Sequence, residues 1–295
     1  MKNLLLSAFF ALAACAPAYA FTDLNANQRF GSGGYTQSDV SVLWGSDTFS
    51  IKPKYSSWKS DTSSGTFKTY SLRMDYTGKT FKAGAEGGIQ PKTDGYDKKY
   101  AEGDFSFSFY PNGDNEDSLY LRFDIGLAAM ITFHADEYQF TTASSGSGHG
   151  QHSGNVTTRP KPFELQQRDY TVFWGAGIGA LELSGDYTKT NYNQTILPTD
   201  RGSQDLTISG LNHVTQGFLD NSWNAKAKFM LGAFRPYVSY TSIRMLDLAD
   251  RELSYSGGME IKWKIVKLRG EYELYKPGNG SDDSSYYGFG ATFMF

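Results

Sequence analysis

Cysteine, proline and long apolar runs are all scarce in this sequence. The 295 residues include one cysteine, Cys15, and 9 prolines, and the mean hydropathy is −0.46. A single cysteine cannot form an intramolecular disulfide, which argues against a small secreted disulfide scaffold. The chain also lacks a run of about 18 apolar residues, the minimum for a membrane helix. If such a chain enters a membrane, a closed β-barrel is the structure left to it.

An excess of positive charge is also absent. Without Lys2, which belongs to the leader discussed next, 27 basic residues stand against 31 acidic ones, a net charge of −4. A nucleic-acid-binding domain normally carries a basic face. We therefore expect no nucleic-acid partner.

The first 20 residues have the three parts of a secretory signal peptide. Lys2 supplies the positive charge, residues 4–14 form the apolar core, and Ala18-Tyr19-Ala20 fits the small-x-small cleavage site. We predict that residues 1–20 are removed and that the mature chain begins at Phe21. In the alternative, the stretch ending at Cys15 is a lipoprotein signal and this cysteine is lipidated.

The composition favours one large all-β domain, because 16% of the residues are aromatic and 32 are glycine. The clearest pattern runs from Leu119 to His134, where apolar residues occupy every second position. This period of two is typical of a β-strand, and the stretch is long enough to cross a bilayer at a tilt. A soluble β-sandwich also shows alternation, but its strands are rarely so long.

Similar alternation defines 13 candidate strands, and closed bacterial barrels generally have an even number. We predict about 12 strands, within a range of 10 to 14, in a transmembrane antiparallel up-and-down β-barrel over residues 38–295. Residues 21–37 are predicted to be an N-terminal lead-in, and the first candidate strand leads into the barrel without counting among the 12. The candidates are Ser38–Trp44, Phe49–Tyr55, Tyr70–Tyr76, Phe81–Ile89, Phe105–Phe109, Leu119–Phe133, Tyr170–Ile178, Leu181–Tyr187, Trp223–Leu231, Arg235–Leu246, Met259–Trp263, Leu268–Leu274 and Tyr286–Phe295.

The last candidate strand ends the chain on an aromatic residue. Tyr287, Phe289, Phe293 and Phe295 lie on one face of it. This ending resembles the assembly signal of Gram-negative bacterial outer-membrane β-barrel proteins. The resemblance implies a location in the cell outer membrane, with outer-membrane lipids and the barrel-assembly machinery as partners. It implies no cofactor.

The connections between the candidate strands fall into two groups, long and short. Two long connections, residues 138–162 and 191–221, are predicted to lie outside the cell, whereas tight turns such as Ile265-Val266 are predicted to face the periplasm. Long loops on one side and short turns on the other are typical of outer-membrane barrels.

The charged faces of the strands are predicted to line the barrel interior. Both signs are interspersed and no ring of one sign is evident, which argues against strong ion selectivity and leaves open whether the lumen is a pore or is plugged. The predicted lumen-lining residues are Arg73, Asp75, Lys82, Glu86, Asp104, Arg122, Asp124, Glu182, Asp186, Lys226, Lys228, Arg244, Glu260, Lys262, Arg269 and Glu271.

These side chains support two functions. The first is a porin-like channel or transport barrel for small hydrophilic solutes. In the second, the charges pair across a plugged barrel that acts as a structural element or binds partners through its outer loops.

Catalysis is not predicted, because the histidines lack the arrangement that it requires. His149 and His152 lie in a glycine-rich stretch that cannot hold a nucleophile and base together. His134 and Asp136 resemble the rim pair of omptin proteases, but the Asp-x-His order of those enzymes is missing, and His213 follows an asparagine. No metal site is predicted.

Overall fold

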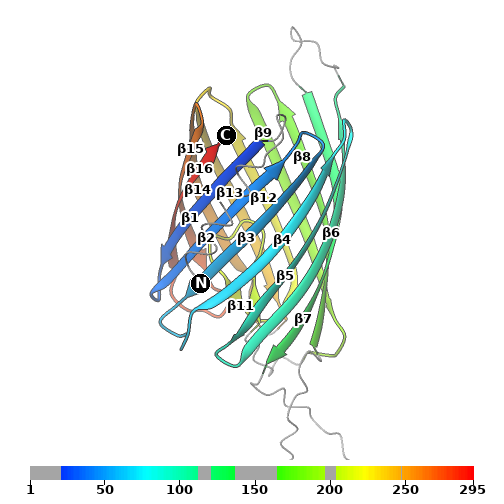
Figure 1. Cartoon of the computed structure of the whole chain (residues 1–295). Helices are drawn as coiled ribbons and strands as arrows, with labels where there is room; N and C mark the ends of the chain where they lie inside the picture. The colour runs from blue at the N-terminus through cyan, green and yellow to red at the C-terminus, as the bar shows by residue number, and fades with distance from the viewer. Residues whose placement is uncertain (1–20, 112–120, 137–164, 197–203, 247) are drawn as a thin grey trace, which may run out of the picture.

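The computed structural model describes residues 21–111, 121–136, 165–196, 204–246 and 248–295. They form a closed antiparallel barrel of fourteen strands and one separate two-stranded hairpin (Figure 1). No helix in these ranges is long and apolar enough to cross a membrane. The strands are β1 (Phe21–Gly31), β2 (Tyr35–Gly45), β3 (Phe49–Lys59), β4 (Phe67–Thr77), β5 (Phe81–Thr93), β6 (Tyr96–Phe109), β7 (Leu121–Asp136), β8 (Leu165–Ile178), β9 (Leu181–Tyr192), β10 (Asp205–Leu206), β11 (Thr215–Gln216), β12 (Leu219–Phe229), β13 (Phe234–Met245), β14 (Glu252–Trp263), β15 (Val266–Lys276) and β16 (Ser284–Met294).

The barrel closes between its first and last strands. β1 pairs with β16 from Asp23 opposite Met294 to Gly31 opposite Tyr286, and it pairs with β2 on its other side. The prediction of an all-β closed barrel is thus confirmed, with a strand number at the upper limit of the predicted range. The long alternating strand is β7, of 16 residues.

The predicted lead-in over residues 21–37 is wrong, because these residues form β1 and the start of β2. The alternation that marks the other strands is weak in β1. Its outward positions include Ala26 and Gln28, which lie opposite Ala291 and Phe289 of β16. Pairing with two neighbouring strands, rather than side-chain pattern, therefore makes this segment a strand.

The two ends of the barrel differ. At the end that we call the turn end, β1 begins and Phe295 is hydrogen-bonded to Thr22, and the described connections between strands are tight. Lys264 has a φ of 50° in the two-residue turn between Trp263 and Val266, which are cross-strand partners. The predicted turn was therefore placed one residue too late. We call the opposite end the loop end.

The outer surface suits a bilayer. Leu72, Ile125, Leu127 and Val172 are all 45–52% exposed in the middle of their strands. Aromatic side chains border this apolar band at both ends, as in membrane barrels. Outward aromatic residues toward the loop end are mostly tyrosines, namely Tyr70, Tyr170, Tyr187, Tyr255, Tyr272 and Tyr287. Those toward the turn end are mostly Phe and Trp, namely Phe49, Phe107, Phe123, Phe229, Phe234, Trp263 and Phe295.

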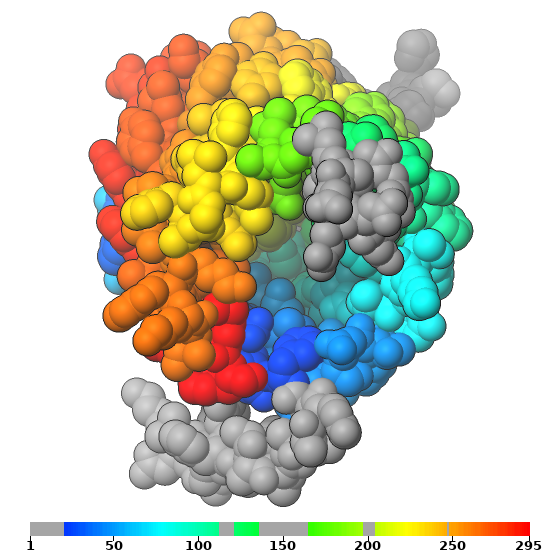
Figure 2. All heavy atoms as spheres, turned by 90° about the horizontal axis from the view of Figure 1, so that it is seen from above, coloured from blue at the N-terminus to red at the C-terminus, as the bar shows by residue number. Residues whose placement is uncertain are grey.

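Part of one long connection folds into the barrel. Residues 204–218, which we call the inner segment, carry the β10–β11 hairpin, and Asp205 and Leu206 pair with Gln216 and Thr215. The whole connection over residues 191–221 was predicted to lie outside. For the inner segment this is wrong, because its side chains contact strands on several sides of the lumen. Figure 2, which looks down on the turn end, shows the molecule hollowed at its centre.

Candidate functional site: the barrel interior

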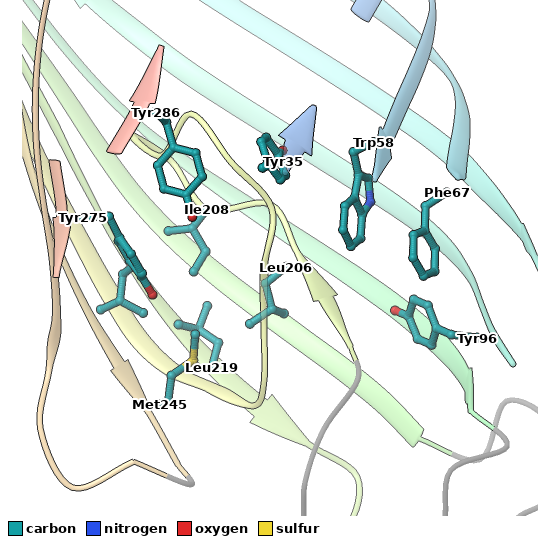
Figure 3. Close-up of a cluster of buried hydrophobic side chains, with 11 residues drawn as sticks. Tyr35, Trp58, Phe67, Tyr96, Leu206, Ile208, Leu219, Met245, Tyr275 and Tyr286 are labelled. Atoms are coloured by element: carbon teal, nitrogen blue, oxygen red, sulfur yellow. The ribbon is translucent and has the colours of Figure 1, made fainter. Parts of the chain in front are cut away.

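An apolar cluster lies at the loop end of the lumen (Figure 3). The inner segment contributes Leu206 and Ile208, which are 4% and 6% exposed. The wall contributes side chains from the loop-end tips of its strands, including Tyr35, Trp58, Phe67, Tyr96, Leu219, Ile243, Met245, Tyr275 and Tyr286. Burial of this many apolar side chains anchors the inner segment, since each contributes about 1.5–3 kcal/mol when fully buried.

A polar anchor on β15 holds one side of the inner segment. The Glu273 carboxylate is fully buried. It accepts a hydrogen bond of 2.8 Å from the backbone N–H of Asn212 and one of 2.6 Å from Ser254 Oγ. His213 Nδ1 lies 3.4 Å from the same carboxylate. The His213 ring stacks on Tyr286 at a centroid distance of 4.0 Å.

A second polar anchor lies at Asp205. Its carboxylate accepts hydrogen bonds from Gln90 Nε2 on β5 at 2.8 Å and from Gln216 Nε2 on β11 at 2.9 Å. Lys98 Nζ on β6 donates to the Asp205 carbonyl oxygen at 2.8 Å. Burial raises the pKa of the Asp205 carboxyl, and the charge of Lys98 opposes that shift. The inner segment is therefore tied to the wall on both sides.

A polar cavity of about 710 Å³ lies beside the inner segment. Residues 205–209 and Val214 of that segment form part of its lining, and strands β2–β9 and β12 contribute the rest. Hydroxyl and amide side chains such as Ser71, Thr171 and Gln167 are prominent in the lining. The charged lining residues are the acidic Glu86, Glu102, Asp104, Asp169, Asp186 and Asp205 and the basic Lys54, Arg73 and Lys98.

A second cavity of about 220 Å³ has the opposite charge balance. It lies against β1–β3 and β14–β16, and Lys54 lines both cavities. Its charged lining residues are the basic Arg29, Lys52, Lys54, Lys267 and Arg269 and the acidic Asp39 and Glu260. Carboxylates thus gather on one wall of the lumen and basic groups on the other.

The structure brings together several of the residues predicted to line the lumen. Arg73, Glu86, Asp104 and Asp186 line the larger cavity, and Glu260 and Arg269 line the smaller one. The Arg73 guanidinium bridges Asp75 at 2.8 Å and Asp104 at 2.7 Å.

The remaining predicted residues mostly meet close partners on the inner face of the wall. Arg122 Nε lies 2.8 Å from Asp124, and Lys228 pairs with Glu260. Glu271 accepts a hydrogen bond from Tyr237 at 2.6 Å and pairs with Arg269. Lys226 Nζ lies 4.1 Å from the centre of the Tyr237 ring. Cross-strand partners place the others: Lys82 lies opposite Ser106, Glu182 opposite Lys228, and Lys262 opposite Lys267.

Arg244 was wrongly predicted to face the lumen. On β13 the buried inward residues are Tyr237, Thr241, Ile243 and Met245, so Arg244 points outward. Its Nη1 donates to the carbonyl oxygen of Ala249 at 2.6 Å. Charge alone suggested an inward position, whereas the strand ends at the membrane surface, where an outward arginine is hydrated.

The histidines that were weighed for catalysis hold structural hydrogen bonds where they are described. His134 Nδ1 lies 2.7 Å from Tyr96 Oη, and its Nε2 lies 3.0 Å from Gln167 Oε1. His149, His152 and the side chain of Asp136 lie outside the described residues, as do residues 1–20 and the whole connection at 138–162. Within the described ranges, no three His, Cys, Asp or Glu residues are placed to hold a metal ion.

Sequence reasoning missed the inner segment, although two signals for it exist. Leu206, Ile208 and Val214 are apolar residues within a long polar connection. Phe67 and Tyr286 are aromatic at inward positions near the loop end, where a water-filled mouth needs polar groups. Apolar residues on both sides of a lumen indicate that something covers them.

No protein-family model and no curated protein matches this chain. Among solved structures, CdiB from Acinetobacter baumannii superposes with a TM-score of 0.50 at 9% identity, covering 95% of this chain. This chain spans 60% of the length of CdiB. OccAB3 from Acinetobacter baumannii has a TM-score of 0.45 at 9% identity over 95% of this chain and 100% of its own. The KdgM porin has a TM-score of 0.43 at 9% identity over 92% and 99%.

At these identities the likeness concerns the fold alone. This likeness agrees with the closed antiparallel sheet. The predicted resemblance to bacterial outer-membrane β-barrels is confirmed, and the chain has the fold and the exterior of a protein of that membrane.

Proposed function

We propose that this barrel is a channel for small hydrophilic solutes whose passage is limited by the inner segment. The observation that carries the proposal is the polar cavity of about 710 Å³ inside the barrel. A barrel that served only as a scaffold would have its interior filled by packed side chains. Here hydroxyl, amide and carboxylate groups face open space, which favours water and polar solutes.

The charge distribution supports a preference for cations in the larger cavity. Cross-strand pairing places Glu86 beside Glu102, Glu102 beside Met130, and Met130 beside Asp169, so three carboxylates lie in one row across β5–β8. In the described part of the chain, none of the three forms an ion pair. Arg73 on β4 is the cross-strand partner of Glu86 and lies at one end of this row. Carboxylates that outnumber the basic groups beside them attract cations and repel anions along a pore. The preference is modest, because the basic wall lies opposite.

A plugged barrel that binds partners at its loop end is the second candidate. The apolar cluster around Leu206 and Ile208 favours it, because buried apolar side chains of the inner segment and of the wall meet at the loop end. The two candidates differ in what happens to solutes. A plugged barrel passes none, whereas the proposed channel passes those small enough to move beside the inner segment.

We do not propose catalysis. His134 is held by Tyr96 and Gln167, and His213 is held between Glu273 and Tyr286. Each histidine thus has a structural role that accounts for its burial.

Liposome swelling tests the proposal directly. Liposomes that contain the purified barrel are diluted into isotonic solutions of neutral sugars of increasing size. We expect swelling with the smallest sugars and a sharp decline as size increases, since the inner segment narrows the lumen. Swelling no faster than in protein-free liposomes, for every sugar, would refute the channel and favour the plugged barrel.

A further inference from the structure

The outer face of the barrel carries a group of basic side chains near the loop end. Arg168 lies on β8, Lys189 on β9 and Arg244 on β13, and Arg251 follows in the next connection; we call these four the basic patch. Asn221 on β12 pairs with Lys189 on one side and with Arg244 on the other, so the patch crosses four neighbouring strands. Arg168 and Arg251 are exposed.

Hydrogen bonds orient part of this patch. Arg251 donates from Nε to Ser242 Oγ and from Nη2 to Asn221 Oδ1, both at 2.8 Å. Lys189 pairs with Asp220, whose other oxygen accepts from Asn221 Nδ2 at 2.7 Å. The patch therefore has four cationic groups, and one carboxylate, that of Asp220, forms an ion pair with one of them, Lys189. The patch keeps a net positive charge.

Aromatic side chains lie directly below the patch, on the side of the apolar band. Tyr187 is the cross-strand partner of Trp223. The Trp223 ring lies 4.8 Å from that of Tyr240, which lies 5.1 Å from that of Tyr255. Tyr170 lies on the same face as Arg168, two residues closer to the turn end. The order from the bilayer outward is thus aliphatic, aromatic and basic, as at an interface between acyl chains and headgroups.

The turn end has no such basic layer. Its outward strand residues are apolar or aromatic, for example Phe107, Phe123 and Phe234, and none of the outward side chains on the turn-end halves of the described strands is charged. The two membrane surfaces therefore present different chemistry to the lipids beside them.

We propose that the basic patch binds the phosphate groups of lipopolysaccharide in the leaflet at the loop end. If the tight turns face the periplasm, as in other outer-membrane barrels, this leaflet is the outer one. Guanidinium groups match phosphate geometry with paired N–H donors. The patch spans β8, β9, β12 and β13, about 14 Å at the usual strand spacing, which is wide enough for a headgroup that carries two phosphates. In this arrangement the acyl chains of the lipopolysaccharide lie against the aliphatic band below Trp223 and Tyr240.

Binding is tested with the purified barrel in neutral detergent. Lipopolysaccharide, the same lipid after removal of its phosphates, and phosphatidylethanolamine are each titrated in, and the temperature at which the folded band disappears from a gel is measured. We expect lipopolysaccharide alone to raise this temperature. In the Arg168→Gln/Arg244→Gln/Arg251→Gln variant, its half-saturating concentration is expected to rise at least about tenfold, since each basic residue near an anionic surface contributes about a factor of five.

Lys68→Gln is the matched control, because Lys68 is also an outward basic residue near a tyrosine, Tyr70, but lies on β4 away from the patch. It is expected to keep the wild-type titration. Arg168→Gln alone, which leaves the hydrogen bonds of Arg244 and Arg251 in place, is expected to give an intermediate shift. Equal titration of wild type and triple variant, equal loss in the Lys68 control, or equal stabilisation by the dephosphorylated lipid would each overturn the proposal.

Discussion

His213 Nδ1 lies 3.4 Å from the Glu273 carboxylate and joins the inner segment to strand β15. The same carboxylate accepts the backbone N–H of Asn212. Glu273 is therefore the wall residue on which one side of the inner segment depends. The barrel itself does not depend on it, because the strands are held by their own ladders.

Replacement of Glu273 by alanine is expected to release the inner segment without unfolding the barrel. Buried donors at Asn212 and Ser254 lose their acceptor, which costs about 1–3 kcal/mol. We expect faster chymotrypsin cleavage after Leu206 or Leu211, with unchanged heat-modifiable migration of the barrel. Asp282→Ala, in the exposed connection between β15 and β16, is the control. Cleavage at the wild-type rate in the Glu273 variant would show that this anchor is dispensable.

Docking of the inner segment is expected to weaken as the pH rises through the pKa of Asp205. Burial raises this pKa in the docked state. The docked segment then holds the proton more tightly than the released one, so this carboxyl favours docking at low pH and the advantage is lost above its raised pKa. The groups that face it are Lys98, Gln90, Gln216 and Trp58. Cleavage of the inner segment should therefore be slower at pH 4 than at pH 7, and Asp205→Asn should flatten this dependence. A steeper pH dependence of cleavage in the Asp205→Asn variant would contradict the assignment of this dependence to the Asp205 carboxyl.

The same substitution at adjacent positions of β7 tests which face meets lipid. Leu127 is 45% exposed on the outer face, whereas Ala128 lines the larger cavity opposite Asp104. Leu127→Arg is expected to cost about 2–4 kcal/mol, because the charge enters the bilayer. Ala128→Arg is expected to cost much less, since water and Asp104 solvate it. Urea unfolding in lipid vesicles measures both, and equal costs would mean that the faces are reversed.

Gly126 is an inward position where even a small side chain is not tolerated. A Cβ atom there would lie 2.2 Å from the Phe173 ring and 2.6 Å from the carbonyl oxygen of Phe105. The simple expectation that a lumen-facing glycine accepts serine fails here, because Phe173 of the next strand packs over it. Gly126→Ser is therefore expected to destabilise the barrel, whereas Ala128→Ser is expected to be nearly neutral in the same urea assay.

Neutralising the carboxylate row is expected to reduce cation preference. Glu86→Gln together with Glu102→Gln removes two of three negative charges along one wall. The reversal potential in a salt gradient should shift toward zero or to the anionic side, with little change in stability. Asp47→Asn, in the β2–β3 turn, is the control. An unchanged reversal potential would place the conduction path elsewhere.

The sequence was sufficient for most of the barrel wall and insufficient for the barrel's contents. Strong alternation, as in Leu121–Phe133, reports a strand because one face meets lipid and the other the lumen. β1 was missed since Ala26 and Gln28 blur that contrast, and the inner segment was missed since its position depends on distant partners such as Glu273 and Gln90. Arg244 shows the limit of reasoning from charge: at the membrane surface an outward arginine is as acceptable as an inward one.

Single-channel conductance in planar bilayers, for the wild type and for a variant without the inner segment, shows whether ions pass through the barrel beside this segment. Asp205 and Gln216 are cross-strand partners, so two glycines can replace residues 206–215 without straining the connection. We expect a small conductance for the wild type and a several-fold larger one for the variant, because the inner segment no longer covers the loop end. No conductance in either protein, or the same conductance in both, would contradict the proposal of a channel limited by the inner segment.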